Sequence, residues 1–349
     1  MTGTVERPKL ALSRKQAIVT VIPIPTNGSL DRRRERYEPM SRAIAHVGYH
    51  KTATTWFQKR FYPAVKSHAY VPRREVQSIF LKPSAFHFDA FSAQETLSGM
   101  GDRLPPIICE EELSGGVHTG GMAGSLSKDA AGRIRAAMPD AEVVIFLRNQ
   151  IEMAAALYMH YIREGGTHSP KRYFFPERYR KDVARHSFKY PVFSFDHLEY
   201  IGLVEHYESL FGKGRVHIFA YESFRTDPVP FVRMFAERLG LEVDWGKVDF
   251  EAENTGYGAN AIRLARLLNR FTYRSVLDKR FCLNLLSNKF RSELPRMLNR
   301  SRLRGQRPTP ERILGPELLG YLRERFVPTN RRLSERYGLV LSELGYPCG

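Results

Sequence analysis

The chain has 349 residues, of which 42% are hydrophobic and 12% aromatic; this excludes wholesale disorder and suits one large α/β domain with extensions or two small domains. Lys and Arg total 54 against 37 Asp and Glu, a formal net charge of +17, so we expect the protein to attract polyanions such as nucleotides, nucleic acid, acidic glycans or anionic lipid. The three cysteines lie far apart and none has zinc-binding spacing, which argues against a disulfide scaffold and favours a reducing, cytoplasmic compartment. No apolar run is long enough to span a bilayer.

Three regions differ in their patterns. Residues 1–40 carry few periodic apolar positions and many charges, which predicts a flexible basic tail. Strand and helix patterns alternate over residues 41–260, which predicts an α/β core. Residues 261–349 show helical patterns only, so we expect a helical extension that packs on the core.

Within the core, apolar and β-branched runs predict strands at residues 44–49, 107–109, 141–147 and 216–221. Helical periodicity and capping signals predict helices at residues 54–61, 127–138, 151–163, 196–212 and 227–240. The first of these should stop at Pro63, and Ser127 and Asp196 should begin two of the others. The alternation predicts a three-layer fold with a mostly parallel sheet and a P-loop-like strand–loop–helix at its start.

The most informative segment connects the first strand to the first helix, and it reads Gly48-Tyr49-His50-Lys51-Thr52-Ala53-Thr54-Thr55-Trp56. Backbone N–H groups at such a junction can hold an anion, and Lys51 adds a mobile positive charge. The segment is not a Walker A loop, because it has one glycine, three residues before the lysine. The strand at 141–147 is followed by Arg148 and Asn149, where a magnesium-dependent kinase would need a carboxylate.

Residues 48–56 resemble the 5′-phosphosulfate-binding loop of the sulfotransferases that use 3′-phosphoadenosine-5′-phosphosulfate (PAPS), in the form found in bacterial members. The segment Arg148-Asn149-Gln150 resembles the family's 3′-phosphate motif, although Ala156 stands where the family usually has a serine. Tyr221, followed by Glu222 and Ser223, resembles the position that lies beside the adenine. The resemblance implies that PAPS would be held by a set of residues from these three segments: His50, Lys51, Thr52, Ala53, Thr54, Thr55, Trp56, Arg148 and Tyr221. For Trp56 and Tyr221, packing in the core is the alternative role.

The same resemblance implies in-line transfer of the sulfuryl group of PAPS to a hydroxyl or amine acceptor, without a metal ion. A carbohydrate or a glycolipid is the expected acceptor. Lys51 would stabilise the charge that develops on the leaving group, and Glu111 would take the acceptor's proton. Glu111 lies between two further glutamates, so mutual repulsion should raise the pKa of one of the three. His87 is the second candidate for the base and Glu75 the third.

Two rival functions remain at this point, a small-molecule kinase with a degenerate P-loop and a basic nucleic-acid-binding protein. No sequence pattern of a nucleic-acid-binding module is present, so we expect no nucleic-acid partner. The stretch from Arg270 to Arg312 is rich in arginine with apolar residues between. It is either a solvated helical face or a surface beside the acceptor site that contacts a membrane or an anionic acceptor.

Overall fold

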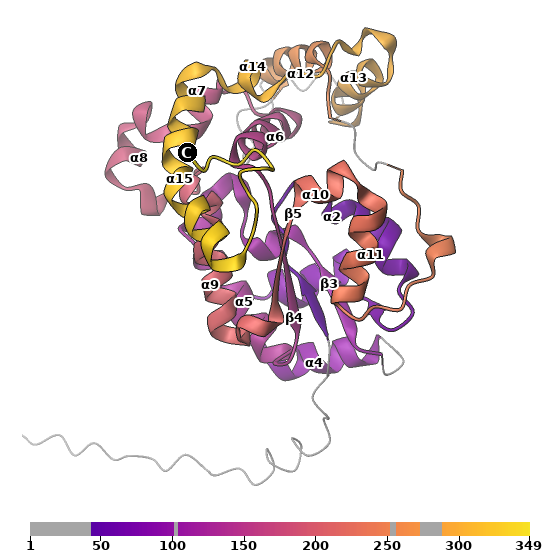
Figure 1. The fold of residues 1–349 in the computed structure, drawn as a ribbon. Coiled ribbons are helices and arrows are strands. Elements are labelled where there is room, and N and C mark those ends of the chain that lie inside the picture. Colours follow the sequence, from indigo (N-terminus) through magenta and orange to yellow (C-terminus); the bar gives the residue numbers. More distant parts are fainter. Residues whose placement is uncertain (1–42, 101–103, 252–255, 273–287) are drawn as a thin grey trace, which may run out of the picture. The chain divides into compact units, whose positions relative to one another are not determined.

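The computed structural model describes residues 43–100, 104–251, 256–272 and 288–349. The predicted tail at residues 1–40 lies outside these ranges. The described part of the core contains one sheet of five strands, all parallel, in the order β2-β3-β1-β4-β5 (Figure 1). The strands are β1 (Ile44–His46), β2 (Ala69–Tyr70), β3 (Pro106–Cys109), β4 (Glu142–Leu147) and β5 (Val216–Ala220). The predicted α/β fold with a parallel sheet is confirmed.

Helices connect consecutive strands and continue after the last one. The longer helical elements are α2 (Thr54–Trp56) with its continuation η1 (Phe57–Phe61), α3 (Arg73–Val76) with η3 (Gln77–Leu81), α4 (Ala90–Gly99), α5 (Ser125–Ala137), α6 (Gln150–Arg163), α9 (Tyr200–Phe211), α10 (Tyr221–Thr226), α11 (Pro228–Arg238), α12 (Ala259–Thr272), α13 (Asn288–Arg300) and α15 (Pro316–Tyr337). Shorter helices are α7 (Pro170–Phe174), α8 (Lys181–Arg185) and α14 (Pro310–Leu314).

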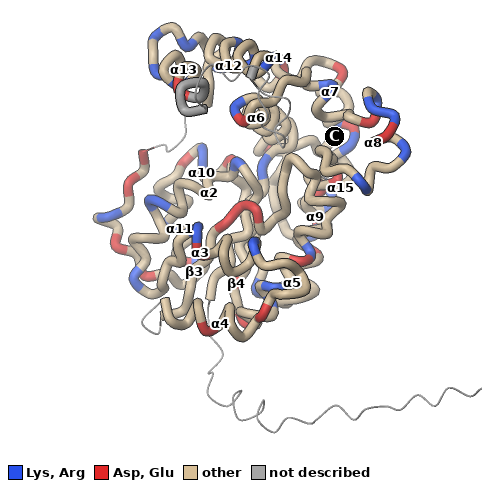
Figure 2. The backbone as a smooth tube through the Cα atoms, turned by 180° about the vertical axis from the view of Figure 1, so that it is seen from behind, with Lys and Arg blue, Asp and Glu red and all other residues tan. Residues whose placement is uncertain are grey.

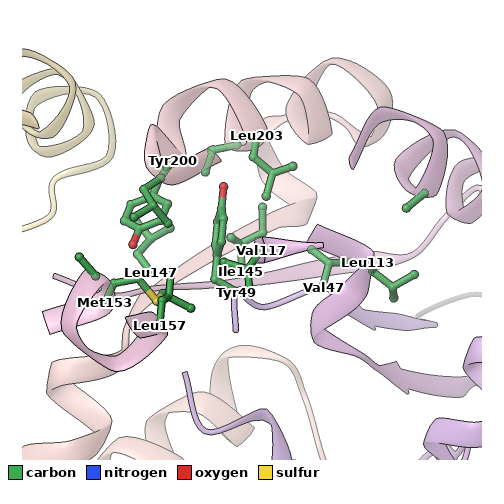
Figure 3. Packing of buried hydrophobic residues seen from close by; sticks show 14 of the residues in the cluster. Val47, Tyr49, Leu113, Val117, Ile145, Leu147, Met153, Leu157, Tyr200 and Leu203 are labelled. Carbon is green, nitrogen blue, oxygen red and sulfur yellow. The ribbon is translucent and has the colours of Figure 1, made fainter. Parts of the chain in front are cut away.

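The two faces of the sheet are covered by different helices, because successive side chains along a strand point to opposite sides. Ala45, Ile108 and Ile145 point to one side and pack in a cluster with residues of α5, α6 and α9, part of which Figure 3 shows. Ile44 and Phe146 point to the other side and pack with aromatic residues of η1, α10 and α11. Burial on both faces explains why the strand sequences are almost entirely apolar.

Several predicted boundaries are wrong in detail. The first helix ends at Phe61 as predicted, but Pro63 does not stop the helical path: it lies near the start of a further turn, η2 (Tyr62–Ala64), where a missing N–H costs little. Ser127 is not a helix cap; α5 begins two residues earlier, and the Ser127 hydroxyl donates to the Ser114 carbonyl at 2.7 Å. Asp196 lies in a separate short turn before α9. The short edge strand β2 was not predicted, because two residues carry no periodic signal.

The C-terminal helices pack against helices of the core. α12 and α15 both contact α6, and α15 also contacts α9. After α15 the chain returns to the end of β4, where the Asn149 side chain donates to the Gly345 carbonyl. Among the described residues, no helix combines the length and the apolar character needed to cross a bilayer.

Candidate anion-binding site at the carboxyl edge of the sheet

Parallel pairing brings the carboxyl ends of the strands to one edge, where the residues singled out in the sequence follow the strands. The loop with Lys51 follows β1, Arg148 follows β4 and Tyr221 follows β5. The acidic turn η4 (Glu111–Ser114) follows β3. Residues from four parts of the sequence therefore meet at this edge.

The loop after β1 has an unusual backbone. Lys51 and Ala53 have φ angles of 63° and 69°, in the left-handed region that residues with a Cβ rarely occupy. A Cβ at Gly48 would lie 3.0 Å from both His46 and Thr54 side-chain atoms, so a glycine is required for the close approach. The buried Thr52 hydroxyl donates to the Tyr49 carbonyl and closes the loop. Such strained, overdetermined loops are common where backbone groups contact a ligand.

The Lys51 ammonium lies in an electropositive and partly desolvated place. Burial, together with the charges of Arg163 and Arg148, lowers the pKa of Lys51 to about 8 against the opposing effect of Glu111 and Glu164. Arg163 at the end of α6 was not singled out in the sequence. The arrangement favours an anion, because a bound negative charge would offset both the desolvation and the repulsion among the cations.

Arg148 is buried beside the loop and has two of its three nitrogens engaged. Its Nη1 donates to the Lys51 carbonyl at 2.8 Å, and its Nη2 lies 3.3 Å from Glu152 Oε2. The guanidinium lies over the Tyr221 ring at 4.7 Å, and its buried Nε has no hydrogen-bond partner among the described residues. Arg148 is therefore held at the anion site. To bind a phosphate through two of its nitrogens, it would have to replace the 3.3 Å contact with Glu152 by one with the phosphate.

The three consecutive glutamates after β3 have different environments. The Glu110 carboxylate is fully buried and accepts from Arg73 Nε at 2.7 Å and from Gln77 at 2.7 Å. Glu112 Oε1 lies 3.1 Å from His50 Nε2, and this hydrogen bond lowers the pKa of Glu112. Glu112 is therefore not the glutamate of this turn with the expected raised pKa, because the hydrogen bond from His50 outweighs the effect of burial.

Glu111 has one engaged and one unengaged oxygen. Its Oε1 accepts from Arg73 Nη2 at 3.1 Å, and its buried Oε2 has no hydrogen-bond partner in the part of the chain that the structure describes. Glu111 also acts electrostatically on Lys51. The two side chains are thus close enough to interact electrostatically.

A pair of histidines beside Lys51 was missed in the sequence. His118 Nε2 lies 3.0 Å from His160 Nδ1, and His118 Nδ1 lies 2.6 Å from the Tyr173 hydroxyl. Burial lowers the pKa of His118 to about 4 and that of His160 to about 2, with Lys51 contributing to both. Both imidazoles are therefore neutral at pH 7. No local sequence motif marks this pair, because the two histidines are 42 residues apart: His118 lies just after the acidic turn and His160 lies on α6.

The remaining residues singled out in the sequence have varied environments. His87 is exposed in a surface turn, 2.7 Å from the Ser84 hydroxyl, and Glu75 is part of α3. Trp56 is 4% exposed and packs against Phe61 and Phe224, which is the core-packing alternative left open by the sequence. Thr54 is buried at the start of α2, whereas Thr55 is half-buried. Ala156 is half-buried on α6 and has no side-chain donor.

Two further features adjoin the edge. A cavity of about 470 Å³ lies beside the acidic turn, lined by Glu112 and by Phe80, Leu126 and Ala130 among others. On the other side, the buried Glu222 accepts from the Asn149 backbone N–H and from the Tyr346 hydroxyl, each at 2.9 Å. Glu222 therefore links Tyr346, in the C-terminal segment, to Asn149, the residue after Arg148. Within the described ranges, no three His, Cys, Asp or Glu side chains are grouped so as to hold a metal ion.

Comparison with known proteins gives structural likenesses only. No family model and no curated protein matches the sequence. A sulfotransferase from Alicyclobacillus acidocaldarius is similar with a TM-score of 0.45 and 20% identity, over 61% of this chain and 86% of that one. A mouse sulfotransferase complexed with PAP gives 0.37 and 15%, over 85% and 88% of the two chains. The sulfotransferase domain from the curacin biosynthetic pathway gives 0.34 and 11%, over 76% and 99%. All three likenesses are too weak to assign a role to any residue of this chain.

Proposed function

We propose that this protein is a sulfotransferase that binds PAPS and transfers its sulfuryl group to a hydroxyl or amine of an acceptor. The observation that carries the proposal is the convergence of Lys51, Arg148 and Arg163 beside a strained loop, where burial and mutual repulsion lower the pKa of Lys51. A bound polyanion compensates for both effects, and a nucleotide with phosphate groups at two positions has the required charge.

The residues present fit such a cosubstrate. The loop from Gly48 to Thr55 would hold the 5′-phosphosulfate, and Arg148 with its unpartnered Nε would hold the 3′-phosphate. Tyr221 lies under the same guanidinium, so its ring is suited to the adenosine side of the site. Trp56 is left out of this assignment because its ring is enclosed by aromatic neighbours.

PAPS would supply an activated sulfuryl group whose transfer leaves negative charge on the bisphosphate product. Lys51 would stabilise that charge through its Nζ, and Arg163 and Arg148 add positive charge around it. Glu111 would accept the acceptor's proton at Oε2, because this oxygen is not engaged by another residue. Glu110 is less suited to this role because Arg73 and Gln77 engage both of its oxygens. Glu112 is less suited because the hydrogen bond from His50 lowers its pKa.

We also propose that the acceptor enters through the cavity beside Glu112 and that it is a carbohydrate or a glycolipid. The cavity's volume of about 470 Å³ exceeds the space that a single hydroxyl group needs, and its lining combines apolar side chains with Lys82 and Asp129. A cytoplasmic location, metal independence and the absence of a nucleic-acid partner belong to the same proposal. Arg148 at the end of β4 favours it over the kinase, which would need a magnesium-binding carboxylate at this position.

The test is transfer of sulfur-35 from labelled PAPS to a panel of saccharides, glycolipids, phenols and tyrosine peptides, without added metal. We expect label in at least one saccharide or glycolipid. A parallel thermal-shift titration should show stabilisation by adenosine 3′,5′-bisphosphate (PAP) and far less by AMP. Equal shifts with the two nucleotides, or magnesium-dependent phosphorylation by ATP, would contradict the proposal.

A further inference from the structure

α12 presents a mixed basic and apolar stripe to solvent. Its buried side carries Ala261, Ala265 and Asn269, and the Asn269 side chain donates to the Ile162 carbonyl of α6 at 2.7 Å. The opposite side carries Arg263, Leu267, Arg270 and Phe271, which recur at helical spacing. Leu267 and Phe271 are each 53% exposed, although both are large apolar side chains.

α13 and the turn that follows it also expose large apolar side chains. Met297 on α13 is 62% exposed, and Leu303 in the turn η11 (Arg302–Arg304) is 72% exposed. This part is attached to α12, because Asn260 donates to the Leu303 carbonyl at 3.0 Å and the Gly258 N–H donates to Asn299 at 2.7 Å. We call this surface the basic–apolar face; its residues are Arg263, Leu267, Arg270, Phe271, Arg296, Met297, Arg300, Arg302, Leu303 and Arg304.

The charge on this face is almost entirely positive. Residues 259–272 and 293–307 contain arginines at 263, 266, 270, 296, 300, 302, 304 and 307 and a single acidic residue, Glu293. Figure 2 shows basic positions along α12 and α13. Among the described residues, the only carboxylate partner of these arginines is Glu293, at 2.7 Å from Arg296. Arg274, Lys279 and Arg280 lie outside the described residues, as do the side chains of Lys289 and Arg291.

We propose that the basic–apolar face docks on an anionic phospholipid bilayer. Arginines at the rim attract anionic headgroups, while exposed Leu, Phe and Met side chains gain by entering the boundary of the acyl region. Nucleic acid explains the arginines but leaves Leu267, Met297 and Leu303 in water, and among the residues named for this face Phe271 is the only aromatic side chain for stacking on bases. The combination therefore favours lipid.

The docking surface is connected to the candidate site. α12 packs on α6, and the Arg163 guanidinium of α6 lies over the Tyr257 ring at 5.2 Å, just before α12. If the proposed sulfotransferase activity holds, docking would place the site close to acceptors carried by lipid. Vesicle binding itself requires no cosubstrate, so it is tested separately from the activity.

The experiment is co-sedimentation of the full chain with vesicles of phosphatidylcholine alone and of phosphatidylcholine with phosphatidylglycerol. We expect binding to the anionic vesicles only, weakened by salt. R300E/R302E/R304E should reduce the partition coefficient by about two orders of magnitude or more, because each basic residue near an anionic surface contributes about fivefold and the new carboxylates are repelled. L267S/L303S should reduce it while the net charge is unchanged. Both variants alter exposed side chains, so melting temperature and PAP affinity should match the parent.

A matched control separates this face from the overall positive charge. K181E/R185E/K189E changes the net charge by the same amount at exposed positions of and near α8, and it should retain most of the binding. Equal losses in the two charge-reversal variants would overturn the proposal, because overall charge would then decide. So would unchanged binding of L267S/L303S, or binding to single-stranded RNA without binding to vesicles.

Discussion

The lowered pKa of Lys51 predicts a specific pH dependence for PAP binding. With a pKa of about 8, Lys51 is mostly protonated at pH 7 and mostly neutral at pH 9. If only the protonated form attracts the phosphate, the dissociation constant of PAP rises about tenfold between these pH values, or about 1.4 kcal/mol. A lysine with an ordinary pKa would stay protonated over the same range and would give a nearly flat profile.

The assay is isothermal titration calorimetry with PAP at constant ionic strength, in buffers of different ionisation enthalpy. Because the bound phosphate raises the pKa of Lys51 again, binding above pH 8 should take up a proton. Lys51→Arg keeps a positive charge at every pH tested. The PAP affinity of this variant should therefore not depend on pH, and PAP binding should take up no proton. A flat profile in the parent, or the same slope in Lys51→Arg, would refute the argument.

Three further predictions follow from the site. In the parent, PAP at one hundred times its dissociation constant should stabilise the fold by about 2.7 kcal/mol. Arg148→Ala should reduce this stabilisation nearly to that given by AMP. A persistent difference between the thermal shifts with PAP and AMP would show that another residue binds the 3′-phosphate. Glu111→Gln should abolish sulfuryl transfer and retain PAP affinity, whereas Glu112→Gln should keep measurable transfer. Loss of transfer in His118→Asn with retention in Glu111→Gln would instead make the histidine pair the proton acceptor. Trp56→Ala should cost about 3–5 kcal/mol in urea denaturation, because it leaves a cavity among aromatic residues; an unchanged midpoint with weakened PAP binding would return Trp56 to the adenosine site.

The sequence alone was sufficient to predict the parallel sheet and to locate the loop after β1. Strands buried on both faces are continuous apolar runs, and this local signal located β1, β3, β4 and β5 to within a few residues. The loop from Gly48 to Thr55 is a contiguous segment whose glycine and lysine are both visible in one dimension. Arg148 could be placed near it because carboxyl ends of parallel strands share one edge.

The tertiary structure decided the roles of residues whose partners are distant in sequence. Glu110, Glu111 and Glu112 are adjacent and chemically identical, yet Arg73 and His50 give them different environments. The His118–His160 pair and the Glu222–Tyr346 contact join residues 42 and 124 positions apart, so no local pattern marks them. Trp56 has a sequence position suited to ligand stacking, but packing against Phe224 encloses its ring. Periodicity reports which side of an element is buried, whereas hydrogen bonding and electrostatics depend on which elements meet, and only the folded chain determines that.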